Sequence, residues 1–243
     1  MPKIQIFPDD AQLAQAAAKA IIDFGLEKIE NQGRFTLTLS GGSTPKATYR
    51  LLPEMAAARK LDWRQVYVLF GDERCVPPDH PDSNYGMARH AFLDHIDIPQ
   101  ENILPMLCTV SPDEAAIAYE EELRELLINQ WDGRLDLILL GLGTNAHTAS
   151  LFPGSTILDE KERLVLPAYI DELESWRLTL TPPALNSAER VMFLVEGEAK
   201  AEAAAHVFED PYDPSRWPAQ VVQPDDGLVE WFMDQAAASR LEF

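Results

Sequence analysis

The run LDLILLGLG, residues 135–143, is almost continuously apolar and ends in glycines. A short run without alternation between polar and apolar residues is typical of a strand that is buried on both faces. Strands of this kind belong to parallel sheets, which helices cover on both sides. The run therefore predicts an α/β fold built on a mostly parallel sheet.

The rest of the chain alternates short β-rich runs with longer helical runs, which is the order expected of such a sheet. Further strands are predicted at residues 3–7, 34–42, 65–73, 177–181 and 190–197. Helices are predicted at residues 9–33, 44–55, 84–96, 111–130, 198–209 and 227–241. Neither a Gly/Ser-rich linker nor a low-complexity tract divides the 243 residues, so we expect a single domain over residues 1–243.

Acidic residues outnumber basic ones, and the formal net charge is -20 at pH 7. An excess of this size argues against nucleic acid or an anionic membrane as a partner, but it allows a small anionic ligand in a local basic pocket. The first residues have no secretory-signal pattern, and no segment is long and apolar enough to span a bilayer. We therefore expect a cytoplasmic protein in which Cys75 and Cys108 are reduced thiols.

Unusual residues follow three of the predicted strands. These segments are SGGSTPK after TLTL, GDER after VYVLF, and GLGTNAH after LILL. The carboxyl ends of parallel strands lie at one edge of the sheet, where α/β proteins bind their ligands. We therefore expect the three segments to be neighbours in space.

The segment LSGGSTPK, residues 39–46, joins a strand to the start of a helix. Gly41 and Gly42 allow a sharp turn and a close approach of the backbone to a ligand. The amides at the helix start, with the hydroxyls of Ser43 and Thr44, form a site suited to a phosphate. A plain turn with Ser43 or Thr44 as the helix cap explains the segment equally well.

Arg74 in FGDERC can bind a carboxylate or phosphate, or stabilise a developing oxyanion, with Asp72 or Glu73 orienting it. A surface salt bridge is the usual alternative, but the preceding strand delivers these residues to the ligand-binding edge. Arg177 and Lys200 are two further cations beside strands or turns, and each alone is typical of an ordinary surface cation.

His147 follows the glycine turn at the end of the most buried strand. A lone histidine is most often a core or capping residue, but this position also suits a general base, because imidazole titrates near neutral pH. The sequence has no GxSxG elbow, and no HExxH or comparable cluster, so we predict neither a serine nucleophile nor a metal nor a cofactor. The remaining chemistry is activation of water, or proton transfer, on a phosphorylated small molecule.

Taken together, the motifs resemble the 6-phosphogluconolactonase family, which is related to the glucosamine-6-phosphate deaminases. The pieces that carry the resemblance occur in the family's order and cover most of the chain: LSGGSTPKATYRLL, VYVLFGDERCVPPDHPDSNYGMAR, LDLILLGLGTNAHTASLFPGS, RLTLTPPALNSAERVMFLVEGEAKA and GLVEWFMDQAAA. The resemblance implies a single Rossmann-like domain, of the kind shared by deaminases, lactonases and ribose-5-phosphate isomerases.

The two branches of the superfamily differ after the histidine. Deaminases resemble GHIAFNEP, with a catalytic glutamate, whereas this chain has AHTASLFPGS, with Phe152 where that glutamate falls. The resemblance therefore implies hydrolysis of 6-phospho-D-glucono-1,5-lactone to 6-phospho-D-gluconate in the oxidative pentose phosphate pathway. The alternatives are a deaminase or isomerase of amino-sugar phosphates, and a sugar-phosphate sensor without catalysis.

The resemblance also implies the roles of the site residues. His147 activates the water, Arg74 and backbone amides stabilise the oxyanion, and the phosphate lies on Gly41, Gly42, Ser43 and Thr44 with Arg177 and Lys200. The family pattern DGH is replaced by Asn145 and Ala146 before the histidine, so a charge is missing that Asp72 can supply. We expect a small phosphorylated lactone as partner, and a monomer or a small homo-oligomer.

Overall fold

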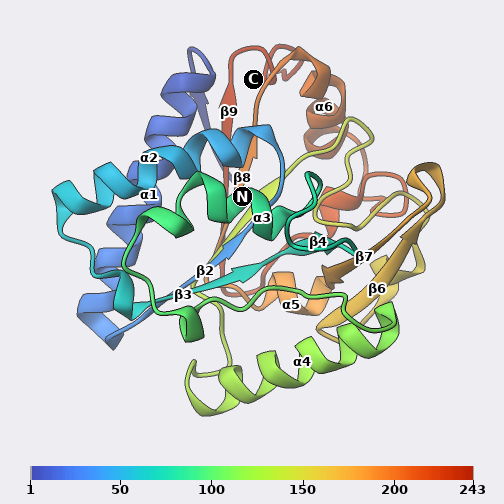
Figure 1. Cartoon of the computed structure of the whole chain (residues 1–243). Helices are drawn as coiled ribbons and strands as arrows, with labels where there is room; N and C mark the ends of the chain where they lie inside the picture. The colour runs from blue at the N-terminus through green and yellow to red at the C-terminus, as the bar shows by residue number, and fades with distance from the viewer. Residues whose placement is uncertain (1, 243) are drawn as a thin grey trace.

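The computed structural model describes residues 2–242 and is built around a six-stranded parallel sheet (Figure 1). The strand order is β1-β9-β8-β5-β2-β3, and every neighbouring pair runs in the same direction. The predicted α/β class is therefore confirmed. The strands are β1 (Lys3–Phe7), β2 (Phe35–Leu39), β3 (Val66–Phe70), β5 (Leu137–Gly141), β8 (Arg190–Val195) and β9 (Leu228–Asp234).

The sheet is covered by helices on both sides, with α1 and α2 on one side and α4 and α5 on the other (Figure 1). The first helix follows its sequence signals, because the Asp9 side chain accepts a hydrogen bond from the Gln12 amide and Gly33 ends the helix with a φ of 75°. The helices are α1 (Asp10–Gln32), α2 (Ser43–Arg59), α3 (Asn84–Ala91), α4 (Pro112–Asn129), α5 (Pro182–Asn186) and α6 (Ala201–Glu209).

The strand β5 lies inside the parallel sheet, between β2 and β8. The side chains of Leu137, Ile138, Leu139 and Leu140 are all fully buried. Because successive side chains of a strand point to opposite faces, burial of four in a row means that both faces are covered. The prediction drawn from the apolar run is confirmed.

A second, antiparallel sheet stands beside the first, in the order β4-β7-β6. Its strands are β4 (Asp72–Arg74), β6 (Val165–Ile170) and β7 (Ser175–Leu180). The predicted strand at 65–73 is therefore wrong in its extent, since it divides at Gly71 into β3 and β4. The Gly71 amide donates to the Leu39 carbonyl in the first sheet, and the Gly71 carbonyl accepts from the Leu180 amide in the second. This glycine thus joins the two sheets.

The predicted helix at residues 227–241 is wrong, because residues 228–234 form β9. This strand lies between β1 and β8 and pairs with both in parallel. Trp231, Phe232 and Met233 are buried at the centre of the sheet. Hydrophobic periodicity alone does not distinguish a short apolar run of this kind from a buried helix. The run forms a strand here because it pairs with a strand on each side.

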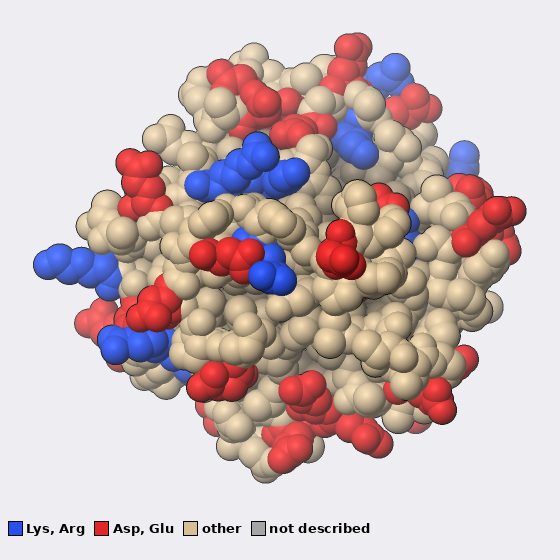
Figure 2. Space-filling view, viewed as in Figure 1, with Lys and Arg blue, Asp and Glu red and all other residues tan. Residues whose placement is uncertain are grey.

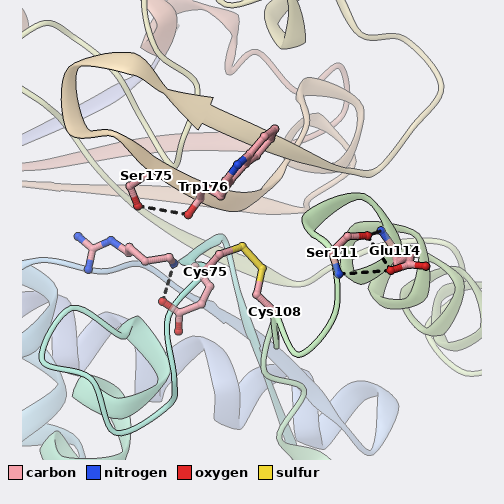
Figure 3. Close-up of a disulfide and its surroundings, with 8 residues drawn as sticks. Cys75, Cys108, Ser111, Glu114, Ser175 and Trp176 are labelled. Atoms are coloured by element: carbon pink, nitrogen blue, oxygen red, sulfur yellow. Dashed lines mark hydrogen bonds between the residues drawn. A yellow bond between two sulfur atoms is a disulfide. The ribbon is translucent and has the colours of Figure 1, made fainter.

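Cys75 and Cys108 form a disulfide, so the expectation of two reduced thiols is wrong (Figure 3). Cys75 directly follows β4, and its amide donates to the Trp176 carbonyl at 2.9 Å, which holds it against β7. Cys108 lies shortly before α4, whose start is fixed by a capping box between Ser111 and Glu114. The two Cα atoms are 5.0 Å apart, although the sequence separation of the two cysteines is 33. The turn of the chain into the second sheet creates this proximity.

The surface shown in Figure 2 carries many scattered acidic side chains, in keeping with the net charge of -20. Among residues 2–242, no helix has the length and apolar character needed to cross a membrane.

Candidate active site

A pocket of about 180 Å³ opens at the carboxyl edge of the parallel sheet. All three segments that follow β2, β3 and β5 contribute to its walls, so the expectation that they are neighbours in space is confirmed. The second sheet and the 3-10 turn after β8 add two cations. The lining residues are Ser40, Gly41, Gly42, Asp72, Arg74, Asn84, Gly141, Leu142, Gly143, His147, Thr148, Ala149, Arg177 and Lys200.

A tight turn after β5 presents the imidazole of His147 to the pocket. The Gly143 amide donates to the His147 carbonyl at 2.8 Å, and the Ala146 amide donates to the Gly143 carbonyl at 3.0 Å. The Thr148 hydroxyl donates to the Gly141 carbonyl at 2.9 Å, which ties the end of the turn back to the strand. The turn is therefore closed by hydrogen bonds within residues 141–148, and the Ala219 amide adds one from another segment by donating to the Ala146 carbonyl at 3.0 Å.

Ala146 occupies the left-handed region of the backbone map, with a φ of 60°. An L-residue in that region costs about 1–2 kcal/mol relative to the right-handed form, which is why glycine is preferred there. The structure thus shows the backbone cost of an alanine at this position. The buried methyl group of Ala146 offsets part of the backbone strain.

Gly143 is required by the closeness of the imidazole to the backbone. A Cβ atom at this position would lie 2.1 Å from Nδ1 of His147. No real pair of heavy atoms approaches so closely without a bond, so any larger residue would displace the ring. Gly143 therefore determines the position of the imidazole, in addition to forming part of the turn.

Asn145 holds the imidazole by its edge. Its Oδ1 atom lies 2.6 Å from Nδ1 of His147 and 3.3 Å from the backbone nitrogen of His147. A backbone N–H can only donate, so the oxygen of the amide, and not its NH₂ group, faces His147. Nδ1 consequently carries the ring hydrogen, and Nε2 is left with a lone pair that can accept a proton.

Phe152 covers one face of the same imidazole. The two rings are stacked, with their centroids 4.1 Å apart and an angle of 12° between the ring planes. The guanidinium carbon of Arg177 lies 5.7 Å from the centroid of the Phe152 ring. Asn145 therefore contacts the imidazole at its edge, and Phe152 contacts it across one face.

The environment of His147 favours the neutral imidazole. Burial lowers its pKa from the ordinary 6.5 to about 4; Asp72 opposes this shift, whereas Arg177, Lys200 and Arg74 add to it. At neutral pH the imidazole is thus unprotonated and able to take up a proton.

Asp72 is a buried carboxylate held by groups from three directions. One oxygen accepts from the Ser150 hydroxyl at 2.7 Å, and the other accepts from the Asn84 amide group at 3.2 Å. The Asn84 side chain also donates to the Asp72 carbonyl at 2.8 Å. The guanidinium of Arg177 lies 3.8 Å away and supplies positive charge. These contacts give both oxygens of a buried carboxyl group partners, where an unpaired group would be costly.

Arg74 and Arg177 face each other across the β4–β7 pair. Within the described part of the chain, the Nε atom of each arginine is buried without a hydrogen-bond partner. Burial lowers the pKa of Arg177, the nearby Asp72 raises it, and Arg74 lowers it further. Two guanidinium groups in one pocket, each with a free buried N–H, form a site that can accept an anion.

The guanidinium of Arg74 is oriented differently from the expectation. It donates to the Asp82 carbonyl and to neither of the two acids considered for that role. Glu73 instead accepts hydrogen bonds from the Ser83 hydroxyl and the amides of Asn84 and Tyr85, at the start of α3. Glu73 thus anchors a helix. Burial raises the pKa of its carboxyl above the ordinary value, although the amides of Tyr85, Asn84 and Arg74 oppose that shift.

The glycine turn after β2 leads directly into α2. Gly42 is the N-cap residue, with a φ of 106°, and no side chain caps the helix. Gly41 and Gly42 line the pocket, whereas Ser43 and Thr44 occupy the first positions of α2, and the Ser43 hydroxyl bonds to Glu196 at 3.1 Å. The capped-turn alternative is therefore wrong, because the first amides of α2 have no side-chain partner.

Lys200 completes the pocket from the turn η6 (Glu198–Lys200), which follows β8. Burial lowers the pKa of its ammonium group, and Glu196 raises it. The pocket thus holds three cations, from β4, β7 and η6, in a protein whose net charge is -20. A local basic pocket of this kind attracts small anions despite the sign of the whole molecule.

The sequence alone did not single out Asn84 and Ser150 as site residues. Asn84 fills the space beside Gly41, where a Cβ atom would lie 2.0 Å from its Oδ1. Ser150 is fully buried and bonds to Asp72, 78 residues away in the sequence. Both contacts join segments that are distant in the chain, so local sequence signals do not reveal them.

Comparisons with known proteins agree with the resemblance seen in the sequence motifs. A family model described as "Glucosamine-6-phosphate isomerases/6-phosphogluconolactonase" matches residues 8–231. The 6-phosphogluconolactonase of Nostoc sp. is 42% identical over 243 residues, covering 98% of this chain and 98% of the relative. The 6-phosphogluconolactonase of Synechocystis sp. is 39% identical, with coverage of 99% and 98%.

A solved structure points to the same group of proteins. The 6-phosphogluconolactonase from Trypanosoma cruzi superposes with a TM-score of 0.86 at 30% sequence identity, and the match covers 100% of this chain and 98% of that one. The resemblance inferred from the sequence motifs is confirmed by these matches.

Proposed function

The chain belongs to the glucosamine-6-phosphate isomerase and 6-phosphogluconolactonase family, and on that premise we propose that it hydrolyses 6-phospho-D-glucono-1,5-lactone to 6-phospho-D-gluconate, in the oxidative pentose phosphate pathway. The single observation that carries the proposal is the state of His147. Its Nδ1–H is held by Asn145, its ring is neutral at physiological pH, and it stands in a pocket with three cations.

His147 acts as the general base in this proposal. Its Nε2 atom takes a proton from a water molecule, whose oxygen forms a bond to the lactone carbonyl carbon. The bond from that carbon to the ring oxygen then breaks, and the imidazolium returns its proton to the leaving oxygen. A pKa of about 4 makes the neutral imidazole a modest base and the imidazolium a ready acid. A δ-lactone is an activated ester, so the departure of the ring oxygen benefits from a ready proton.

The cations have separate tasks in the proposal. Arg74, with backbone amides of the pocket, stabilises the negative charge that develops on the carbonyl oxygen. The phosphate of the substrate lies against the uncapped start of α2, at Gly41–Thr44, with Arg177 and Lys200. The phosphate is not part of the bond that breaks, so binding it orients the carbonyl without taking part in the reaction.

Phe152 distinguishes the proposal from a deaminase. The deaminase branch needs a carboxylate at this position to move protons during ring opening, and a phenyl ring carries no titratable group. In this chain the phenyl ring of Phe152 takes the place of that carboxylate and stacks on the imidazole of the proposed base.

The test is a lactonase assay with purified protein, read against the uncatalysed rate, because the lactone also opens in water. We expect acceleration that His147→Ala removes, while binding of 6-phosphogluconate, measured by calorimetry, is largely retained. Release of ammonia from glucosamine 6-phosphate would instead identify a deaminase. Binding of 6-phosphogluconate without acceleration by the unaltered protein would identify a sensor.

The cytoplasmic location and the monomeric or small homo-oligomeric state stay predictions of the proposed function. Cell fractionation and light scattering of the purified protein measure them directly. A small phosphorylated lactone is the partner that the family membership implies.

A further inference from the structure

His147 lines one cavity, and Phe152, which stacks on His147, lines another. The first is the 180 Å³ pocket that contains His147. The second, which we name the side cavity, measures about 750 Å³ and is lined by the loop 152–157 and by parts of β6 and β7, including Tyr169 and Trp176. Asn145 and Phe152 line the side cavity, whereas His147 lines the first pocket. These two side chains therefore form the wall between the cavities.

The wall consists of the contacts that hold the imidazole. On one edge, Oδ1 of Asn145 fixes the Nδ1–H of His147 at 2.6 Å. On one face, the half-buried Phe152 ring lies 4.1 Å away and nearly parallel. A hydrogen bond in the ring plane does not prevent the imidazole from tilting about that bond, and a flat ring against its face does. Without the phenyl ring, the same face would open to the side cavity and its solvent.

We propose that Phe152 is a positioning residue, whose ring fixes the plane of the His147 imidazole and closes that face of it against the side cavity. Its relevance to catalysis rests on the proposed lactonase function, although the contact itself does not. The residue touches neither the reacting carbon nor the attacking water, and acts only through His147. The position that distinguishes the two branches of the superfamily thereby has a task of its own in this chain.

The charged groups around His147 set the expected consequence. Asp72 and Arg74 approach from β4, Arg177 from β7 and Lys200 from η6. The carboxylate favours the charged imidazolium and the three cations disfavour it, while burial is the largest contribution and also disfavours it. Opening the face of the ring to solvent removes part of the burial and leaves the charges in place. The pKa of His147 then rises towards 6.5.

The experiment compares Phe152→Leu and Phe152→Ala with Phe152→Tyr, which keeps a flat ring. Tyr169→Leu is the matched control, because it alters an exposed aromatic residue of the side cavity whose ring packs on Trp176, whereas Phe152 is the ring stacked on the imidazole. The primary measurement is an NMR titration of labelled histidine, with the His147 signal assigned by its loss in His147→Gln. Circular dichroism and thermal melting confirm that each variant is folded.

We expect the pKa of His147 to rise by at least about one unit in Phe152→Leu and further in Phe152→Ala, and to stay near the original value in Phe152→Tyr and Tyr169→Leu. The acid limb of the kcat/KM profile should move by the same amount, and kcat at pH 7.5 should fall by about tenfold or more in the two variants without a ring. An unchanged His147 pKa in folded Phe152→Ala overturns the inference.

The two proposals fail separately. An original protein that titrates as described but does not accelerate lactone opening contradicts the proposed function and leaves the positioning role supported. An active protein whose pH profile and kcat at pH 7.5 are insensitive to Phe152→Leu and Phe152→Ala contradicts the positioning role and leaves the lactonase proposal supported.

Discussion

The Oδ1 atom of Asn145 accepts from two donors of His147, the ring Nδ1 at 2.6 Å and the backbone nitrogen at 3.3 Å. One neutral oxygen thus determines both the tautomer of the imidazole and its direction. A carboxylate at this position would do the same and would add a negative charge. The difference between the family pattern and this chain is therefore one of charge and not of hydrogen bonding.

Asn145→Asp should restore that charge and change the pH dependence. A carboxylate in contact with the imidazole favours the charged form, so the pKa of His147 should rise from about 4 by about 1–3 units. Protonated His147 cannot act as a base, so the acid limb of kcat/KM should move upward by the same amount. Activity at pH 8 should be kept or increased.

Asn145→Ala serves as the control for this change, because it removes the hydrogen bond without adding charge. Asn145→Ala should lower kcat at every pH. The acid limb of its kcat/KM profile should not move upward as that of Asn145→Asp does. A complete loss of activity in folded Asn145→Asp would mean that the site requires the amide.

His147 should also make the folded state sensitive to acid. Its pKa is about 4 in the folded protein and about 6.5 in the unfolded chain, so between these values only the unfolded chain binds the proton. The free energy of unfolding should therefore fall by about 3 kcal/mol as the pH drops from 6.5 to 4. Urea unfolding of the original protein and of His147→Gln at several pH values isolates this contribution, because the other acids titrate in both. Equal pH dependence of the two proteins would contradict the shifted pKa.

Gly143→Ala should lower kcat by about 100-fold while the protein still folds. The added methyl group would lie 2.1 Å from Nδ1 of His147, so the ring must move out of its place. A displacement of about 1 Å in a catalytic group is enough to lower kcat by about 100-fold. Gly71→Ala is the matched control at another strand end, since its nearest atom would be 3.4 Å away. Comparable activity of the two variants would show that the imidazole is not held at this position.

Lys200→Gln should weaken recognition of the phosphate more than it affects the reaction. We expect kcat/KM for the phosphorylated lactone to fall by about 10-fold to 100-fold, which corresponds to the loss of one charge-assisted contact. Hydrolysis of unphosphorylated glucono-1,5-lactone should change little. Equal losses with both lactones would place Lys200 in the reaction itself and not in phosphate binding.

Reduction of the Cys75–Cys108 disulfide should destabilise the protein. The bond closes a loop with a sequence separation of 33, and the loss of that constraint from the unfolded chain costs about 3–4 kcal/mol. Urea unfolding with and without dithiothreitol measures the difference, and the double variant Cys75→Ser, Cys108→Ser should not respond to the reductant. An unaltered protein that is equally insensitive to dithiothreitol would show that the bond does not contribute to stability.

The residues at the strand ends were predictable because they depend on local signals. A buried strand followed by glycines places its next polar residue at the carboxyl edge, and this holds for Gly41, Asp72 and His147. The partners of these residues were not predictable, because Ser150 and Asn84 reach Asp72 through the tertiary fold. The sequence singled out Arg177 as a cation. Its place opposite Arg74 depends on the second sheet, and the three residues of β4 are too short a run to predict that sheet from the sequence.

Two errors have a common cause. The segment at 227–241 combines an apolar run with an alanine-rich tail, and both helix and strand satisfy such a pattern until a neighbouring strand is known. The pairing of Cys75 with Cys108 likewise depends on which segments meet in space. In both cases the structure is decided by a contact between segments that are distant in the sequence. No local sequence pattern indicates such a contact.

The position of β9 between β1 and β8 has a consequence for how the molecule forms during synthesis. β1 is an edge strand whose partner in the sheet is β9, and Lys3 meets Glu230 across 227 residues of chain. On a ribosome, the backbone donors and acceptors of β1 have no strand partner until residues 228–234 have emerged. A polypeptide released before residue 228 would leave β1 and β8 with open edges separated by the width of one missing strand. Premature termination should therefore yield an aggregation-prone intermediate with unpaired strand edges, and not a shorter folded protein.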